Sequence, residues 1–261
     1  MPGLTTAWLG RHALHFEEID STNTWLKERL TSDLPQGTAV LASLQTAGKG
    51  RLGRQWSERR NTGLALSFLL RDFAPEAMPA LPLAIGLGVC LALADLGPEV
   101  QAAIKWSNDV LLAEGEGWKK ICGILCETRS GTGTVVAGMG VNLTQTRQQL
   151  EADGLVYATS VQLVTGQIWQ PTVLAAHIAN RLEPILEQLR AGGFAAIQEE
   201  YSRRCLTIGR QVRILERDGS ARVGEALGVS PRGDLVCRME NGGEESIGAG
   251  EVSVRGLYGY V

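Results

Sequence analysis

The fold is decided by residues 102–141, which read AAIKWSNDVLLAEGEGWKKICGILCETRSGTGTVVAGMGV. Runs rich in Val, Ile, Leu and Ala separated by Gly, Asn and Asp predict short β-strands. The strands are expected at 102–106, 110–113, 120–127 and 134–141. The glycines of residues 114–117 indicate a hairpin turn. Links this short leave no room for crossover helices, so the strands should pair mostly antiparallel.

The flanking sequence adds further strands and several helices. Further strands are predicted at 13–19, 38–44 and 63–70. Helices are predicted after the capping residues 20–23, over 75–96 with an irregular turn at its prolines, and over 171–191 and 194–206. Helices combined with consecutive, mostly antiparallel strands predict an α+β fold, with a mixed sheet and flanking helices.

The pattern changes after residue 206. Short alternating strands are expected at 211–216, 222–229, 234–238 and 252–257, separated by glycine-containing turns. This spacing is typical of a small β-barrel. We therefore predict two domains, a larger catalytic domain at 1–206 and a C-terminal β-barrel domain at 207–261.

Composition narrows the class of protein. The 261 residues carry a net charge of −3, which argues against a general nucleic-acid binder. The longest apolar stretch, residues 78–96, is interrupted by Pro, Gly and Asp, so we expect no membrane span. The five cysteines form no CxxC pair, and no secretory signal is recognisable at the N-terminus. We therefore expect a cytoplasmic protein with reduced thiols.

Residues 45–56, QTAGKGRLGRQW, are the most informative for function. From residue 49 to residue 60 there are five basic residues and one acidic residue. Glycines between them allow backbone amides to approach an anion, while Lys49 and Arg51 add charge. The alternative is a solvated basic loop. The spacing matches neither a P-loop nor a dinucleotide fingerprint.

Four further segments carry weaker signals, each with a structural alternative. Residues 105–109, KWSND, can orient a ribose or hold Mg²⁺, or form an Asx turn. Lys120 enters an apolar strand, where it needs an anion unless it lies at a sheet edge. The glycines of residues 138–142, GMGVN, admit a flat ligand or simply pack tightly. Residues 20–23, DSTN, cluster hydroxyls and an amide, or cap a helix.

Taken in their order along the chain, the five segments are residues 20–23, 45–56, 105–109, 120–127 and 138–142. Together they closely resemble the biotin protein ligase family, over about residues 13–257. Two departures are visible, because Lys49 replaces the arginine that usually begins the family's basic loop, and Ser107 replaces the proline of its Trp-Pro-Asn-Asp segment. The resemblance implies a class II synthetase-like catalytic domain followed by an SH3-like barrel. About a dozen residues precede the first strand, so we expect the type without an N-terminal DNA-binding domain.

The resemblance also implies the reaction and its residues. Biotin and ATP would form biotinyl-5′-AMP, with Mg²⁺ as cofactor, and biotin would pass to a lysine of the biotin carboxyl carrier protein of acetyl-CoA carboxylase. Catalytic roles fall to Lys120 and Arg51. The expected biotin and ATP ligands are Ser21, Thr22, Asn23, Gln45, Gly48, Lys49, Gly50, Arg51, Arg54, Trp56, Asn108, Asp109, Lys120 and Gly123. Mg²⁺ would lie near Asn108 and Asp109.

The resemblance leaves some alternatives open. A lipoate ligase or octanoyl transferase has the same catalytic architecture, but the basic loop and the C-terminal barrel favour biotin. A nucleic-acid-binding module using the basic loop with Trp56 is disfavoured by the acidic composition. Pairing of two chains through the edge of the catalytic sheet would give a homodimer. We expect neither DNA nor a membrane as partner.

Overall fold

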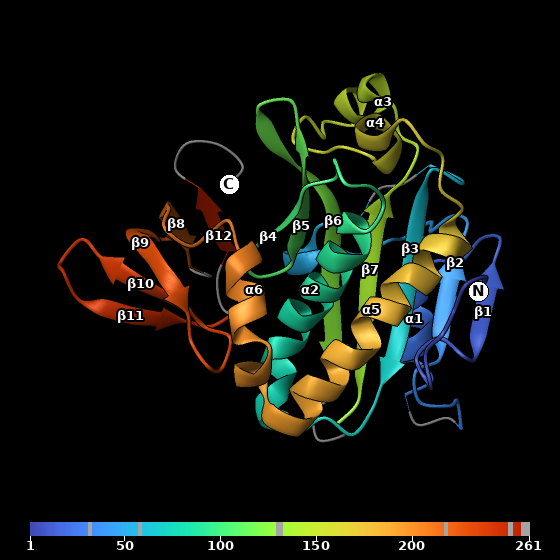
Figure 1. Ribbon diagram of the computed structural model, residues 1–261, viewed down its shortest axis with the longest axis horizontal. Coiled ribbons are helices and arrows are strands. Elements are labelled where there is room, and N and C mark those ends of the chain that lie inside the picture. The colour runs from blue at the N-terminus through green and yellow to red at the C-terminus, as the bar shows by residue number, and fades with distance from the viewer. Residues whose placement is uncertain (31–32, 57–58, 129–132, 217–218, 250–252, 257–261) are drawn as a thin grey trace.

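A seven-stranded mixed sheet forms the centre of the larger part of the molecule (Figure 1). The computed structural model describes residues 1–30, 33–56, 59–128, 133–216, 219–249 and 253–256. The strands are β1 (Ala13–Phe16), β2 (Ala39–Ala42), β3 (Gly63–Leu70), β4 (Ala102–Lys105), β5 (Asp109–Glu114), β6 (Gly117–Thr128) and β7 (Val135–Asn142). Their order is β1-β2-β3-β7-β6-β5-β4. Only the β1–β2 pair is parallel among these neighbours, so the α+β prediction is confirmed.

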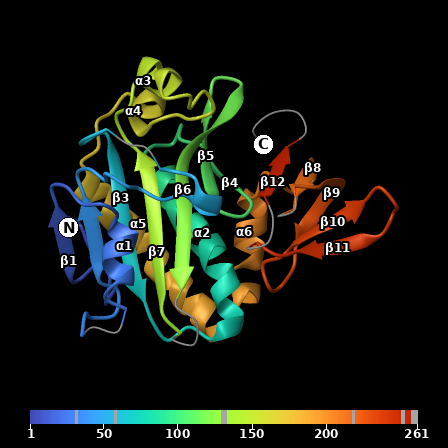
Figure 2. The ribbon, with the colours of Figure 1, turned by 180° about the vertical axis from the view of Figure 1, so that it is seen from behind.

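Helices cover the two faces of this sheet unequally. On one face, which we call the core face, α2 (Leu81–Ala94) and α5 (Pro171–Gly192) pack against each other and against the strands. The other face, which we call the pocket face, carries the short helix α1 (Thr22–Lys27), which packs mainly on β2, β3 and β7 (Figure 2). The rest of the pocket face is therefore left for the site described below.

Alternation along the strands explains the core face. On β3, Leu64, Leu66, Phe68 and Leu70 are buried in the main core cluster, while Leu69 joins a smaller cluster under α1. Because successive strand residues point to opposite faces, the two clusters lie on opposite sides of the sheet.

The apolar segment at residues 75–96 has the predicted form. A short 3₁₀ helix, η2 (Pro75–Ala80), contains the prolines, and α2 follows it. By length and composition Pro75–Ala94 would suffice to cross a membrane, but 67% of its most apolar window is buried inside the protein. It is the central helix of the core.

Several short helices were not predicted from the sequence. Two helices, α3 (Arg147–Ala152) and α4 (Val161–Thr165), are too short to show a helical period, although Thr146 and Gln149 form a capping box at α3. The helix expected at 194–206 is instead η3 (Phe194–Ala196) followed by α6 (Gln198–Arg204).

The C-terminal residues form a separate antiparallel sheet. Its strands are β8 (Gln211–Leu215), β9 (Ala221–Val229), β10 (Leu235–Met239), β11 (Glu244–Ile247) and β12 (Ser253–Gly256), in the order β11-β10-β9-β8-β12. The polar strand β11 was not predicted, because two glutamates and a serine give it little β-propensity. Residues 252 and 257 of the last predicted strand lie outside the described residues. The division at 206/207 stays a prediction.

Candidate active site

A cavity of about 480 Å³ opens on the pocket face and collects the predicted site residues. All of them line it except Gly48. These are Ser21, Thr22, Asn23, Gln45, Lys49, Gly50, Arg51, Arg54, Trp56, Asn108, Asp109, Lys120 and Gly123. Residues from widely separated parts of the sequence therefore meet at one place, as their order along the chain had suggested.

Gly48 contributes from behind the cavity wall. Its carbonyl accepts a hydrogen bond from the Trp56 backbone N–H at 2.9 Å, which folds the basic loop back on itself. A Cβ at Gly48 would lie 2.6 Å from the Trp56 carbonyl oxygen, so a larger residue would push the loop apart. Gly48 lies outside the cavity lining, its part in ligand binding stays a prediction, and glycine is required there by close backbone approach.

Arg51 connects three parts of the molecule. It begins the 3₁₀ turn η1 (Arg51–Gly53) and donates to Ser107 Oγ at 2.7 Å and Asn108 Oδ1 at 2.8 Å. Its other terminal nitrogen donates to the carbonyl of Ala249, in the turn that follows the last residue of β11, at 2.8 Å. Burial lowers the pKa of Arg51, and the nearby Asp109 carboxylate partly offsets this. The guanidinium is therefore a partly desolvated cation that is held in a defined position.

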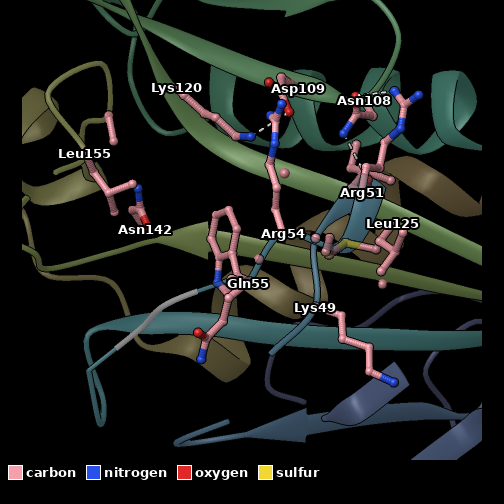
Figure 3. Close-up of a pocket in the computed structure, with 18 of the residues that line it drawn as sticks. Lys49, Arg51, Arg54, Gln55, Asn108, Asp109, Lys120, Leu125, Asn142 and Leu155 are labelled. Carbon is pink, nitrogen blue, oxygen red and sulfur yellow. Dashed lines mark hydrogen bonds and ion pairs between the residues drawn. The ribbon is translucent and has the colours of Figure 1, made fainter. Parts of the chain in front are cut away.

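Two more cations gather beside Arg51 (Figure 3). Lys120 Nζ lies 2.7 Å from Asp109 Oδ1, and Arg54 extends from the loop toward the same carboxylate. Lys49 is exposed and points away from this group. Arg51, Arg54 and Lys120 thus face one side of the cavity, where an anionic group would be strongly attracted.

A β-bulge places Lys120 in the cavity. Along the β5–β6 pair, Val110 opposes Cys122 but Leu111 opposes Lys120, so one residue of β6, Ile121, is extra. Ile121 and Cys122 are both buried in the core cluster, whereas Lys120 and Gly123 both line the cavity. Strict alternation would have separated Lys120 from Gly123, and bulges of this kind often re-aim a side chain near a site.

The opposite side of the cavity is polar but uncharged at its surface. Ser21 caps α1, and its oxygen accepts from the Thr24 N–H at 3.4 Å. Gln45 Oε1 accepts from the Thr22 N–H at 2.9 Å. Thr22 and Asn23 are nearly fully buried, so each needs hydrogen-bond partners within the protein or from a ligand.

The floor between these two sides is made of glycine. Gly123 of β6 and Gly140 of β7 are directly paired, and the Trp56 indole lies over them. A Cβ at Gly140 would be 2.3 Å from Trp56 Cε2, and one at Gly123 would be 3.0 Å from Trp56 Cζ3. The absence of side chains therefore admits an aromatic ring against the sheet.

Sequence reasoning did not assign several lining residues to the site. Asn142 lies in the GMGVN segment, and the segment's polar end was the signal that could have singled it out. Lys105 and Ser107 belong to the KWSND segment, of which only the last two residues were chosen. Leu155 and Tyr157 come from a stretch without periodicity, and no signal in the sequence placed them here.

The residues proposed for Mg²⁺ do not form a metal site by themselves. Asn108 Oδ1 already accepts from Arg51, and Asp109 is paired with Lys120. No group of three or more His, Cys, Asp or Glu side chains that could hold a metal occurs within the described part of the chain. Mg²⁺ usually needs several oxygen ligands, so a cage built by these two residues does not fit.

The mixed sheet, the cation-lined cavity on its open face and the C-terminal sheet together define a ligase of the biotin and lipoate type. The biotin/lipoate A/B protein ligase family model matches residues 15–143, and the model of the biotin protein ligase C-terminal domain matches residues 207–255. The chain belongs to the biotin protein ligase family.

Individual relatives agree with this assignment. The biotin–[acetyl-CoA-carboxylase] ligase of Mycobacterium tuberculosis is 33% identical over 90% of this chain and 86% of its own length. The enzyme of the same name from Paracoccus denitrificans is also 33% identical, over 89% of this chain and 96% of its own. Among solved structures, the Aquifex aeolicus biotin protein ligase in complex with biotin and ATP superposes with a TM-score of 0.78 at 28% identity, covering 94% of this chain and 99% of that one.

Proposed function

We propose that this protein activates biotin with ATP to give biotinyl-5′-AMP and pyrophosphate, and then transfers the biotinyl group to a lysine of a biotin carboxyl carrier protein. One observation carries the proposal. In a chain of this family, a cluster of cations and a cluster of uncharged polar groups face each other across a single cavity. This arrangement suits a substrate that has a neutral polar ring at one end and a carboxylate at the other.

The first step joins two anions. A carboxylate oxygen of biotin attacks the α-phosphorus of ATP, the bond from that phosphorus to the bridging oxygen breaks, and pyrophosphate leaves. Arg51, Arg54 and Lys120 reduce the repulsion between carboxylate and triphosphate and stabilise the charge that develops during the attack. We assign Lys120 to the oxygens between carboxylate and α-phosphate, because the bulge aims it at the glycine floor.

The uncharged side of the cavity holds the biotin ring in this proposal. Ser21, Thr22, Asn23 and Gln45 present hydroxyl and amide groups that match a ureido ring, which both donates and accepts hydrogen bonds. The apolar part of biotin lies toward Gly123. Trp56 packs on the nucleotide or the adenylate, and the amides of Gly48 and Gly50 shape the loop that approaches the phosphates.

The second step consumes the mixed anhydride. The neutral amine of the carrier lysine attacks the acyl carbon, the bond to the phosphate oxygen breaks, AMP leaves and the amine loses a proton to water. A nucleophilic serine or cysteine is not needed, since the substrates supply both nucleophiles. The names of the two ligases at 33% identity support a carboxylase subunit as the carrier.

Mg²⁺ enters, in this proposal, with the triphosphate of ATP and not at a site built by the protein. The engagement of Asn108 and Asp109 by cations supports this view. Calorimetric titration of the nucleotide-free protein with Mg²⁺ should then show no binding in the micromolar range. Saturable binding there would restore a protein-built site.

The proposal also covers assembly and location. We propose a homodimer formed through the exposed edge of the catalytic sheet at β1, whose described pairing is with β2 alone. Light scattering at micromolar concentration, with and without biotin and ATP, tests it, and a 28.0 kDa species in both conditions would refute it.

A cytoplasmic location is supported by five free cysteines, most of them buried.

Pyrophosphate release is the direct test of function. The protein is incubated with ATP, Mg²⁺ and either biotin or lipoate, and a biotin carrier domain is then added. We expect release with biotin only, followed by a streptavidin-reactive carrier. Release with lipoate only would assign the chain to the lipoate branch of the same fold.

A further inference from the structure

The turn that joins β4 to β5, residues 106–108, contacts the C-terminal sheet on one side and Arg51 on the other. Trp106 is 3% exposed, and its indole N–H donates to the Gly233 carbonyl at 3.1 Å. Gly233 lies between β9 and β10. This hydrogen bond therefore ties the turn to the C-terminal sheet, which lies beside β4 (Figure 1).

Two further contacts fix the place of Trp106. Its backbone N–H donates to Thr207 Oγ1 at 3.0 Å, and Thr207 is also buried. Gly233 has a φ of +93°, and a Cβ there would lie 3.2 Å from Leu83 Cδ2 of α2. Glycine thus lets the turn between β9 and β10 pack closely on α2. The acceptor of the Trp106 indole N–H is therefore held by the core of the larger part of the molecule.

The two residues after Trp106 are hydrogen-bond acceptors whose positions are already set. Asn108 Nδ2 donates to the Ile124 carbonyl at 3.2 Å, so the amide turns its Oδ1 toward Arg51 (Figure 3). Ser107 is 3% exposed, and its Oγ is 2.7 Å from the same Arg51 nitrogen. Because a terminal guanidinium nitrogen carries two N–H groups, Ser107 and Asn108 together engage both of them.

The C-terminal part of the chain meets Arg51 a second time. Ala249 accepts from the other terminal nitrogen of Arg51 at 2.8 Å. A path of contacts that leaves Arg51 through Ser107 and enters the C-terminal sheet at Trp106 therefore returns to Arg51 at Ala249. Among the residues that the structure describes, none after Ala158 lines the cavity. The described part of the C-terminal sheet thus reaches the site by way of Arg51.

The guanidinium needs these acceptors because of its surroundings. Burial lowers the pKa of Arg51, and the positive charge of Arg54 adds to this effect while the Asp109 carboxylate opposes it. A desolvated cation that loses a hydrogen-bond acceptor becomes less stable in its place. Arg51 would then turn toward water and away from Arg54 and Lys120, and the site would lose part of its positive charge.

We propose that Ser107 is a positioning residue that holds the Arg51 guanidinium beside Arg54 and Lys120, and that Trp106 anchors Ser107 to the C-terminal sheet. This inference rests on the proposed function, and it gives the C-terminal sheet a part in adenylate formation. The contact from Ser107 distinguishes this chain from the usual pattern of the family, because the proline that usually stands there has no hydroxyl group.

The test follows adenylate formation by single-turnover pyrophosphate release at saturating ATP. A hydrogen bond to a charged group typically corresponds to about 10–100-fold in an equilibrium. Because Asn108 still accepts from Arg51 in the Ser107→Ala protein, we expect the rate to fall by about 10-fold, at the lower end. KM for biotin should stay within about twofold, since the uncharged side of the cavity is unchanged. Trp106→Phe keeps a buried ring but removes the indole N–H, and the same rate should fall about threefold.

The same substitutions in an Arg51→Ala protein separate positioning from support of the fold. Without Arg51 there is no guanidinium to position, so Ser107→Ala and Trp106→Phe should change the remaining rate, followed over hours, by less than about twofold. Ser43→Ala is the matched control, because Ser43 Oγ contacts His15 Nε2 and Ser43 lies outside the cavity lining. It should leave the rate unchanged in both backgrounds. Urea midpoints ensure that only folded proteins are compared.

The outcomes separate the inference from the proposed function. If the unaltered protein releases no pyrophosphate with biotin and ATP, the proposed function fails. If it does, but Ser107→Ala keeps the full rate, or loses as much without Arg51 as with it, the inference is overturned. An Arg51→Ala protein with the full rate would overturn it as well. If Trp106→Phe alone keeps the full rate, the C-terminal sheet has no part in holding Arg51, and that half of the inference is wrong.

Discussion

The two faces of β7 are almost equally buried and yet have opposite compositions. Its core-face residues are the apolar Val135, Ala137, Met139 and Val141, which pack in the main core cluster. Its pocket-face residues are Val136, Gly138, Gly140 and Asn142. Only Val136 on this face belongs to an apolar cluster, the one under α1. Burial alone therefore does not distinguish the core from the site.

The difference lies in what fills the space beside each face. On the core face each side chain fills volume, and removing atoms leaves a void. On the pocket face the missing side chains of Gly138 and Gly140 leave room for Asn23 and for the Trp56 indole. A strand can thus support stability with one face and function with the other, and substitutions should separate the two effects.

The largest expected effect is on the core face. Phe68→Ala removes a fully buried ring from β3 and should lower the free energy of unfolding by about 3–5 kcal/mol. The adenylation rate per folded molecule should remain near that of the unaltered protein. Urea unfolding and single-turnover pyrophosphate release, both below the new midpoint, measure the two quantities. A large rate loss in fully folded protein would break the separation of the faces.

The next effect is on the pocket face. Lys120→Ala removes a cation from the site of developing charge, and losses of this kind typically reduce rates about 10²–10³-fold. Single-turnover pyrophosphate release measures it. Lys119→Ala is the matched control, since Lys119 Nζ contacts the Val156 carbonyl outside the cavity lining. Rates within a few-fold for both variants would make Lys120 an ordinary surface lysine.

A smaller change tests the glycine floor. In Gly140→Ala the new methyl would meet the Trp56 indole at 2.3 Å, so the ring must move off the sheet. We expect KM for ATP to rise about 10-fold, with little change in thermal stability. Leu66→Met, on the core face of the neighbouring strand β3, has nearly the same volume and lies outside the cavity lining, so it should change neither quantity much. An unchanged KM in Gly140→Ala would show that the position of the ring does not matter for nucleotide binding.

The sequence predicted which residues form strands and which line the site. It predicted less well the face of the sheet to which each side chain points. Strongly apolar runs such as β3 and β7 carry their own signal, and the polar segments between them mark the positions where a site can form. The bulge at Ile121 carries no such signal, because one extra residue in a strand leaves the composition unchanged. Only the register of β5 against β6 shows that Lys120 and Gly123 share a face.

Roles that depend on long-range contacts were also beyond prediction. Ser67 sits in an apolar strand, where a lone serine gives no indication of a partner. Its partners Thr22 and Asn23 are 45 and 44 residues away. The hydrogen bond from Arg51 to Asn108, 57 residues away, likewise could not be predicted from the local sequence, which had suggested Asn108 as a neighbour of Mg²⁺.

The smallest expected effects concern two neighbouring residues of β6, one of which titrates at acid pH and the other at alkaline pH. Glu127 has a folded-state pKa below its ordinary 4.5, because hydrogen bonds from Lys27 and Asn23 overcome the opposing effect of burial. Burial raises the pKa of the Cys126 thiol from 9.0 to about 12. The stabilisation from Glu127 is therefore present above about pH 4.5 and is lost as the pH falls through its lower folded-state pKa. That from Cys126 is present below about pH 9 and is lost as the pH rises toward 12. Urea midpoints across pH should show Cys126→Ala flattening only the alkaline limb and Glu127→Gln flattening mainly the acid limb. Because the Glu127 charge also contributes to the raised pKa of Cys126, the alkaline decline in Glu127→Gln should end at a slightly lower pH. An acid limb altered by Cys126→Ala would contradict the assignment of that limb to Glu127.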